Sequence, residues 1–592
     1  MLEEMILAAR ADKALWLPDL RAAFETEKNA SDLILRLHLH RGEILDFSCR
    51  LPRWETDEER ALVRAYLLAR VYNLLSVYSG QELCFYRDGS DGALNTLLGE
   101  LDLAFQLNEE KRMGYGKVIN IANRISRAFG GEPFRFTTAE LSDFRPAPGL
   151  PAAGKTDLRR TLMDACDRAQ GQCLCGVDVG GTDVKLAISA GGKLLAVKEY
   201  DWNPAASPTA EGIVEPILLL VRLLRACAAA ELAGERKLRA RLEAALRKHA
   251  SDGEIRAAAE LAEATLGQRV QVLDGVGVSF PDIVIANRIV GGETPKTDGM
   301  RHNTEREYEA AFAELGQLET RLLALCVPGA QVHLTNDGNM AAFTAAAELA
   351  ASPDADAVRR GVVAHTLGTD LGSGWLLPDG TIPPLPLELY DLILDLGSAV
   401  SAAYDPRDLR STRNANSGLP GARRYMGQAA AYRLAQQLDS TMLEGFTTEA
   451  EGVLDVILKP QDLRKACLAH LMALADAGKP EAEEIFRRIG LHLAVVSREM
   501  DQLLHPQTQL RFLFGRFVKS PRCFELLCEG FSCYEKEMRL VAPDENLACT
   551  PLMKQLARRG DVTVAQFGQA IGAIYYAARE PKHEGGNRHE TQ

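Results

Sequence analysis

Positive charge is scarce in this chain of 592 residues. It carries 68 lysines and arginines against 81 aspartates and glutamates, a net charge of −13, and its basic residues are scattered along the sequence. Proteins that bind nucleic acids or anionic membranes usually concentrate positive charge on one surface. We therefore predict neither a nucleic-acid partner nor a membrane partner.

A long uninterrupted apolar run is also missing. The most apolar stretch, IVEPILLLVRLLRACAAAEL at 213–232, is broken by Glu215, Arg222 and Arg225. The first residues carry glutamates where an export signal needs basic residues. The sequence thus predicts no membrane span, no export signal and a cytoplasmic location.

Cysteines are few and irregularly spaced. The 12 cysteines form no CxxC pair and no regular framework, a pattern typical of a reducing compartment. Cys523, Cys528 and Cys533 recur every five residues, but no nearby histidine completes the usual zinc spacing. Buried thiols are the favoured interpretation and a metal site is the lesser alternative.

The chain is long enough for three or four domain-sized units. Leucines alternate mostly with polar residues over 33–39, and Leu45, Phe47, Cys49 and Leu51 do so over 45–51, which predicts a hairpin with one buried face. Thr56 and Glu59 form a capping box before a long helical pattern. Periodicity ends in a linker at 145–155, so we predict an α+β N-terminal domain over 1–150, whose role the sequence does not indicate.

The stretch CGVDVGGTDVKLAIS at 175–189 is an apolar strand, a two-glycine turn and a second strand. A third strand follows at 194–202, then a helical insertion at about 205–266 that divides where Ser251 and Glu254 make a capping box. A strand at 272–280, a helix at 304–325 and a strand at 331–337 come next. A second strand, glycine turn and strand unit occupies 361–382, so we predict mixed α/β structure in two similar lobes, 171–336 and 337–592.

Tight glycine turns hold phosphate well, because no Cβ blocks the approach to their backbone N–H groups. Two such hairpins facing each other across a cleft would cradle the phosphates of a nucleotide, with Asp178 available for magnesium, directly or through water. A pair of ordinary turns is the alternative.

Four motifs, VDVGGTDVKLAI, GVGVSFPD, LTNDGNMAAF and LGTDLGSGWLLPDGTI, resemble in order those of the ROK family of sugar kinases and repressors. The likeness covers about 171–580. It implies two actin-like, ribonuclease H-like lobes around a nucleotide cleft and ATP-dependent phosphoryl transfer to a sugar hydroxyl, with ATP and Mg²⁺ as cofactors. Family kinases are often dimers, so a homodimer is compatible with the resemblance. The first segment lacks the basic recognition helix of repressor members, which argues against transcriptional repression.

The resemblance also implies site residues. Asn336 and Asp337 match the pair that holds the sugar hydroxyl and takes its proton; a carboxylate at a strand end suits such a base. A structural aspartate capping the next helix is the alternative for Asp337. Ser279, in the second motif, is assigned to the substrate. The first phosphate loop comprises Asp178, Gly180, Gly181 and Thr182, followed by Lys185.

The second phosphate loop departs from the family pattern. It contains Gly368, Thr369 and Gly372, but Asp370 stands where a glycine is usual and would repel phosphate unless a metal lies between. In the adenosine region only Gly515 is retained, since Arg516 and Phe517 fill the following positions.

ELYD at 388–391 aligns Glu388 with the sugar-binding glutamate of the family and Asp391 with its zinc-ligating histidine. No cysteine lies between Cys326 and Cys467, so we predict no zinc. Glu388 as a solvated turn residue is an open alternative. A closing helix is expected at VAQFGQAIGAIYYA, 564–577.

The favoured function is an ATP-dependent sugar kinase. A non-catalytic sugar or nucleotide sensor is the main rival, indicated by Asp370 and the missing adenosine glycines. An activator ATPase that uses cysteines for an iron–sulfur cluster is a third class, which the irregular cysteine spacing disfavours.

Overall fold

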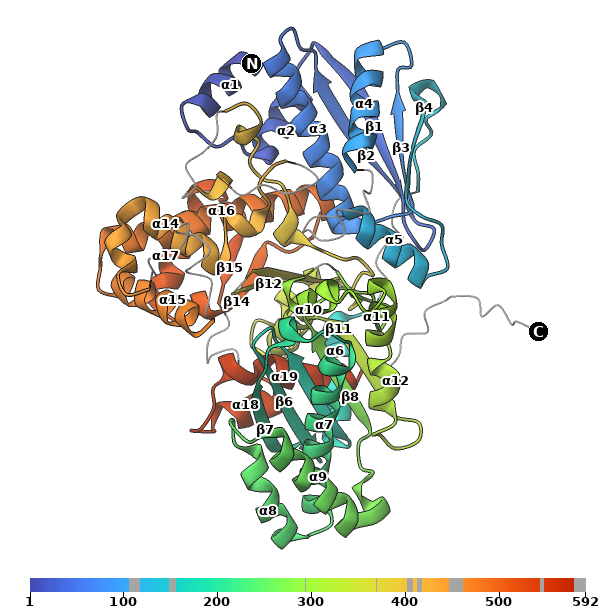
Figure 1. The fold of residues 1–592 in the computed structure, drawn as a ribbon, viewed down its shortest axis with the longest axis vertical. Helices are drawn as coiled ribbons and strands as arrows, with labels where there is room; N and C mark the ends of the chain where they lie inside the picture. Colours follow the sequence, from blue (N-terminus) through green and yellow to red (C-terminus); the bar gives the residue numbers. More distant parts are fainter. Residues whose placement is uncertain are drawn as a thin grey trace, which may run out of the picture.

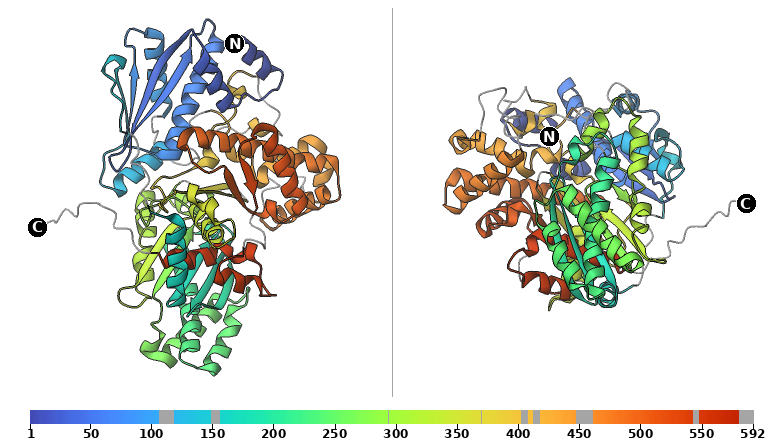
Figure 2. Two further views of the ribbon diagram at one scale, coloured as in Figure 1. Left: turned by 180° about the vertical axis from the view of Figure 1, so that it is seen from behind. Right: turned by 60° about the horizontal axis from the view of Figure 1, so that its bottom comes forward.

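The computed structural model describes residues 1–105, 118–148, 156–292, 294–368, 370–401, 408–411, 418–446, 461–542 and 548–579. Figure 1 shows three parts along the long axis. The N-terminal part lies at one end and the first lobe at the opposite end. The second lobe, built from the C-terminal half of the chain, lies between them. Figure 2 shows the same arrangement from behind. The calls on Thr369 and on most of the linker fall outside the described residues.

The N-terminal part contains a four-stranded sheet in the order β2-β1-β3-β4. The predicted hairpin is confirmed: β1 pairs antiparallel with β2, and Leu33, Leu35 and Leu37 are buried. The predicted capping box is also present, with the Thr56 hydroxyl accepting from the Glu59 N–H at the start of α3. The elements are α1 (Leu2–Arg10), α2 (Leu17–Thr26), β1 (Ala30–His38), β2 (Ile44–Pro52), α3 (Asp57–Tyr78), β3 (Glu82–Arg87), α4 (Gly92–Phe105), α5 (Val118–Ala128) and β4 (Arg135–Glu140).

The first lobe is a five-stranded sheet in the order β11-β8-β5-β6-β7. Strands β5, β6 and β7 form an antiparallel meander, and β8 and β11 run parallel to β5, which is the ribonuclease H-like order. The strands are β5 (Cys173–Val179), β6 (Asp183–Ala190), β7 (Lys193–Asp201), β8 (Gly275–Phe280) and β11 (Gln331–Asn336), with a short hairpin of β9 (Val284–Ile285) and β10 (Arg288–Ile289).

The helices of the first lobe follow the sequence with one difference. The insertion forms α7 (Glu211–Leu232), α8 (Arg236–Leu246) and α9 (Asp252–Leu266), and α9 starts at the predicted Ser251–Glu254 capping box. The single helix predicted for 304–325 is wrong, because α11 (Tyr308–Leu315) ends at Gly316 and α12 (Leu318–Leu323) starts anew. The short α10 (Asp298–His302) precedes them.

The second lobe repeats the strand arrangement of the first lobe with one strand fewer. Its sheet has the order β13-β12-β14-β15, in which β12 and β13 are antiparallel and β14 and β15 run parallel to β12. Two lobes of related order, expected from the repeated strand, turn and strand units, are thus confirmed. The elements are β12 (Val362–Leu367), β13 (Leu371–Leu376), β14 (Leu510–Gly515), β15 (Arg539–Val541), α13 (Asp337–Ala350), α14 (Gly427–Asp439), α15 (Gln461–Asp476), α16 (Pro480–Leu504), α17 (Pro521–Tyr534) and α18 (Pro551–Ala557); α6 (Leu158–Gln170) precedes the first lobe.

The closing helix α19 (Val564–Ala577) forms where the sequence predicts it, but it packs against β5 and β8 of the first lobe. Gly176 and Gly277 are register partners on these strands, and a Cβ at either would lie 1.9 Å from a carbonyl oxygen of α19. The two glycines therefore make the groove in which α19 lies. The second lobe predicted at 337–592 thus includes a helix that packs on the sheet of the first lobe.

The N-terminal part shares one hydrophobic core with the second lobe. Backbone hydrogen bonds also cross between them: Leu17 N donates to Leu394 O at 2.7 Å, and Leu396 N donates to Leu15 O at 2.9 Å. Asn73 of α3 both donates to Ile393 O at 3.0 Å and accepts from Ile393 N at 2.8 Å. The N-terminal part is thus packed tightly against the second lobe.

Helix α5 connects the same N-terminal part to the first lobe. Arg124 donates to Gly291 O at 2.8 Å and makes two hydrogen bonds of 2.9 Å to Glu309. Ile121 and Ile125 pack in a small cluster with apolar residues of the β9–β10 region. The N-terminal part therefore contacts both lobes. Within the described ranges, every helix is too short or too polar to cross a membrane.

Candidate active site

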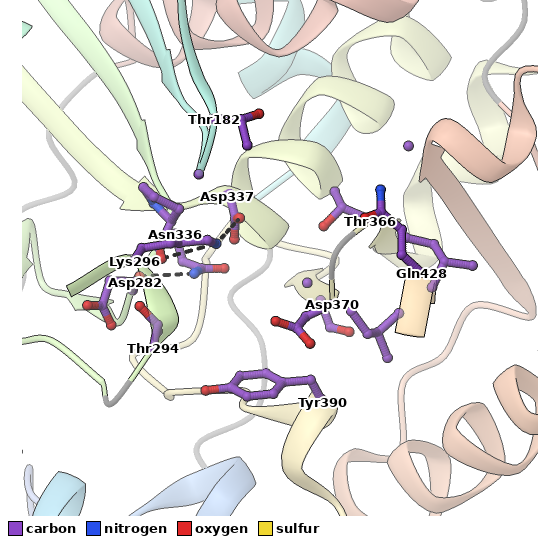
Figure 3. Close-up of a pocket in the computed structure, with 18 of the residues that line it drawn as sticks. Thr182, Asp282, Thr294, Lys296, Asn336, Asp337, Thr366, Asp370, Tyr390 and Gln428 are labelled. Atoms are coloured by element: carbon purple, nitrogen blue, oxygen red, sulfur yellow. Dashed lines mark hydrogen bonds and ion pairs between the residues drawn. The ribbon is translucent and has the colours of Figure 1, made fainter. Parts of the chain in front are cut away.

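A cavity of about 350 Å³ lies between the two lobes. Figure 3 shows side chains from both lobes pointing into it. The sequence-predicted residues that line it are Gly181, Thr182, Asn336, Asp337, Gly368, Gly372, Glu388 and Gly515. The structure brings these residues together although they span more than half of the chain.

The first glycine turn connects β5 to β6. Gly180 N donates to Asp183 O at 2.8 Å, and Trp202 Nε1 donates to Gly180 O at 2.9 Å, so the turn is closed and fixed from behind. Gly181 and Thr182 face the cavity, whereas Gly180 and Lys185 do not line it. The Lys185 ammonium is instead paired with the Asp183 carboxylate.

Asp178 and Ser279 are register partners on β5 and β8, just below the first turn. Neither side chain lines the cavity, and Ser279 is fully buried, so this placement does not support substrate contact by Ser279. Burial raises the pKa of Asp178 to about 6, although Lys185 and the Ser279 hydroxyl favour its charged form. Unlike Ser279, Asp178 is only partly buried, and a single carboxylate in this position suits a magnesium ion held mainly by phosphate and water oxygens.

Asn336 and Asp337 stand where β11 passes into α13. The Asn336 side chain is the helix cap: it accepts from Gly338 N at 2.8 Å and donates to Asp282 O at 3.0 Å. The alternative in which Asp337 caps the helix is therefore wrong. Asp337 accepts from Gly338 N at 2.9 Å, and its carboxylate, 25% exposed, faces the cavity.

The second glycine turn closes despite Asp370. Gly368 N donates to Asp370 O at 3.0 Å, and Gln428 N donates to Gly368 O at 3.1 Å. Asp370 itself lines the cavity, so its negative charge faces the space between the two turns.

Glu388 is only 6% exposed, and the alternative of a solvated turn residue is wrong. Burial raises its pKa well above the ordinary value. Its backbone N–H donates to Ser76 O of α3 at 3.0 Å, and the preceding Leu387, held at a φ of 52°, donates to Val77 O at 3.2 Å. Such a conformation costs free energy in a residue other than glycine, and the contact with α3 maintains it.

The sequence did not single out three cavity residues that follow β8. Asp282 is 3% exposed, and its Oδ1 accepts from Ile283 N at 2.7 Å and from Gly292 N. Burial raises the pKa of Asp282 to about 6. Thr294 and Lys296 lie in the connection after β10. Asp282 stands in the quoted GVGVSFPD motif, whereas no pattern marks Thr294 or Lys296.

Three buried polar atoms of residues that line the cavity have no hydrogen-bond partner among the described residues: Asp282 Oδ2, Thr294 Oγ1 and Glu388 Oε2. All three residues line the cavity. An unpaired buried polar atom is costly, so this arrangement suits a ligand that carries several hydroxyl groups.

Lys296 lies between the first turn and Asp337. Its side chain passes close to Gly181, where an added Cβ would lie 3.4 Å from Lys296 Cε. Its ammonium is 3.8 Å from the Asp337 carboxylate (Figure 3). The Lys296 ammonium thus lies in the cavity between the first glycine turn and the Asp337 carboxylate.

Gly515 ends β14 with a φ of 111°, and a Cβ there would lie 2.0 Å from Leu367 O. The position therefore requires glycine. Arg516 follows it into the cavity, whereas Phe517 is fully buried in the core.

We next compared the chain with known proteins. No protein-family model and no curated protein matches it. Solved structures similar to it include a ROK-family glucokinase from Streptomyces griseus in complex with glucose and AMPPNP, at 18% identity over 69% of this chain and 100% of that chain, with a TM-score of 0.38.

Two further similar structures differ in function. A ROK hexokinase from Thermus thermophilus has 16% identity over 68% of this chain and 98% of that chain, with a TM-score of 0.36. A ROK-family transcriptional regulator, a homologue of the E. coli MLC protein, has 12% identity over 88% of this chain and 100% of that chain, with a TM-score of 0.37. At these TM-scores the likenesses carry no argument, and the class of protein, two actin-like lobes around a cavity, rests on the strand orders described above.

Proposed function

We propose that this protein is an ATP-dependent kinase that transfers a phosphoryl group to a hydroxyl of a sugar or sugar-like compound. The observation that carries the proposal is the position of Asp337, whose carboxylate enters a cavity bounded by one glycine turn from each lobe. A base at that point and phosphate-binding turns beside it are the parts that phosphoryl transfer requires.

The acceptor would bind at the end formed by Asp282, Thr294 and Glu388. Their unpaired oxygens, together with the Asn336 and Asp337 side chains, would hydrogen-bond several hydroxyl groups and orient one of them toward the donor. Closure of the lobes would exclude water and so reduce wasteful hydrolysis of ATP.

In the transfer, the acceptor oxygen forms a bond to the terminal phosphorus while the bond from that phosphorus to the bridging oxygen breaks. The acceptor proton passes to Asp337, and the electron pair of the broken bond stays on the departing diphosphate. Lys296 would offset negative charge on the phosphoryl group during transfer. Asp178 would hold Mg²⁺, which supplies further charge neutralisation when bound. We expect no zinc at this site.

A non-catalytic sugar or nucleotide sensor is the second candidate. Asp370 favours it, because a carboxylate that faces the phosphate-binding space weakens phosphate binding. A sensor would, however, need no base at Asp337.

Replacement Asp337→Asn tests the proposal. It keeps the side-chain shape and removes the base, so turnover should fall by about a hundred- to ten-thousandfold while ligand binding is largely retained. The measurement is ADP release with magnesium ATP over a panel of hexoses, amino sugars and polyols, with calorimetry for binding. Asp356→Asn, an exposed change in the second lobe, is the matched control.

Near-normal turnover by the Asp337→Asn protein would end the assignment of the base. A wild-type protein that binds sugar but releases no ADP with any compound of the panel would reject the kinase and favour the sensor.

A further inference from the structure

The Gly515 end of the cavity has a surplus of cations. Lys465 of α15 and Arg516 line it together with Gly181, Thr182 and Gly515. Across the described ranges, neither the Lys465 ammonium nor the Arg516 guanidinium has a hydrogen bond or an ion pair, and the same holds for the nearby Lys519. The two cations that line the cavity, Lys465 and Arg516, are thus left without a hydrogen-bonded or ion-paired carboxylate.

Lys185 is an electrostatic neighbour of these cations. The pKa of Asp183 is below its ordinary value despite burial, because Lys185 and then Lys465 favour its carboxylate. Burial, followed by the charges of Arg516 and Lys185, lowers the pKa of Lys519. Four cations from both lobes are therefore electrostatic neighbours, with the carboxylates of Asp183 and Glu199 close to them, and an anion would stabilise this surplus of positive charge.

The residues that line the Gly515 end of the cavity suit a chain of phosphates. The first glycine turn adds backbone donors through Gly181, while Asp370 makes the second turn a poorer phosphate site. Among the described residues that line the cavity, Tyr390 is the only aromatic one, and it lies beside Glu388 at the acceptor end. Phe517 packs near Phe486 in the core and offers no surface for stacking a base.

We propose that Lys465 and Arg516 bind the oligophosphate chain of the phosphoryl donor, so that the donor is recognised by its phosphates rather than by its base. The inference rests on the proposed kinase function and names the donor chemistry of the same cavity. An oligophosphate can come from a nucleoside triphosphate or from inorganic polyphosphate, and both would bind.

Calorimetric titration of the full chain in the presence of magnesium tests this directly, with ATP, inorganic tripolyphosphate and adenosine as separate ligands. Tripolyphosphate should bind within about tenfold of ATP, and adenosine should show no saturable binding, since charge-assisted hydrogen bonds to phosphate supply the affinity. The double variant Lys465→Gln/Arg516→Gln should weaken both phosphate ligands by about tenfold to a hundredfold. Lys237→Gln on α8, at the far end of the first lobe, is the matched control (Figure 1).

Two results would overturn the inference: tripolyphosphate binding more than about tenfold weaker than ATP, or unchanged binding by a double variant that melts like the wild type. If the double variant does not fold, the wild type still decides, because tripolyphosphate affinity that does not fall with rising salt excludes a cation cluster. A protein that binds tripolyphosphate through these residues, yet phosphorylates no sugar, keeps this site and rejects the kinase. The two failures are therefore distinguishable.

Discussion

A buried carboxyl oxygen without a hydrogen-bond partner lowers the stability of the fold. Asp282 illustrates this, because its buried Oδ2 has no donor among the described residues, while Oδ1 accepts from two backbone N–H groups. Its pKa rises from 3.8 to about 6, so the folded protein binds a proton at this site more readily than the unfolded chain. Ionisation of Asp282 therefore destabilises the fold above pH 6, and the cost disappears as the pH falls toward 4.

Asp282→Asn should remove this cost. The amide oxygen can still accept from Ile283 and Gly292, and no charge is buried, so the variant should gain roughly 1–3 kcal/mol at pH 7.5. The gain should shrink at pH 5, where the wild-type group is mostly protonated. Thermal unfolding of both proteins at the two pH values measures it, with the exposed Asp164→Asn as control. A gain that is equal at both pH values would show that ionisation of Asp282 is not its cause.

At the scale of the element, the close packing of α19 onto β5 and β8 is set by two missing side chains. Gly277→Ala would put a Cβ 1.9 Å from Ala573 O, and neither backbone can give way without moving the helix. We expect a loss of roughly 1–3 kcal/mol or more. Gly99→Ala is the matched control: it lies exposed within α4 with nothing within 4 Å, so it should stabilise by about 0.5–1 kcal/mol. Chemical denaturation compares the two, and equal effects would contradict the packing argument.

Elements with a local signal were predictable from sequence. The two strand, turn and strand units, the capping boxes at Thr56 and Ser251, and Asp337 at a strand end follow from short-range patterns, and the structure contains each of them. Thr294 and Lys296 lie on an irregular connection whose course depends on tertiary contacts, including the Arg124 bond to Gly291. The docking of α19 on the first lobe was equally unpredictable, since it joins residues about 400 positions apart.

On the scale of the whole molecule, the N-terminal part and the second lobe should unfold as one unit, because they share a core. Asn73→Ala would leave both backbone groups of Ile393 unpaired inside that core, and we expect a loss of roughly 2–4 kcal/mol. Hydrogen exchange should then speed up together in α3 and in residues 389–397.

The control is Asn95→Ala, which removes the hydrogen bond that the Asn95 side chain donates to Gly89 O within the N-terminal part. It should leave exchange in residues 389–397 unchanged. Faster exchange in α3 alone after Asn73→Ala would show that the two parts unfold separately, and would contradict the shared core.

The position of α19 at the end of the described chain has a consequence for synthesis on the ribosome. Strand β5 is made early, but the helix that covers it is made about 400 residues later, which takes about 20–80 s at ordinary translation rates. Until then the groove formed by Gly176 and Gly277 has no occupant from its own chain. The lobe whose strands are translated first is therefore the one completed last, and a nascent chain that stops before residue 564 would offer this groove to chaperones rather than hold a finished cavity between two lobes.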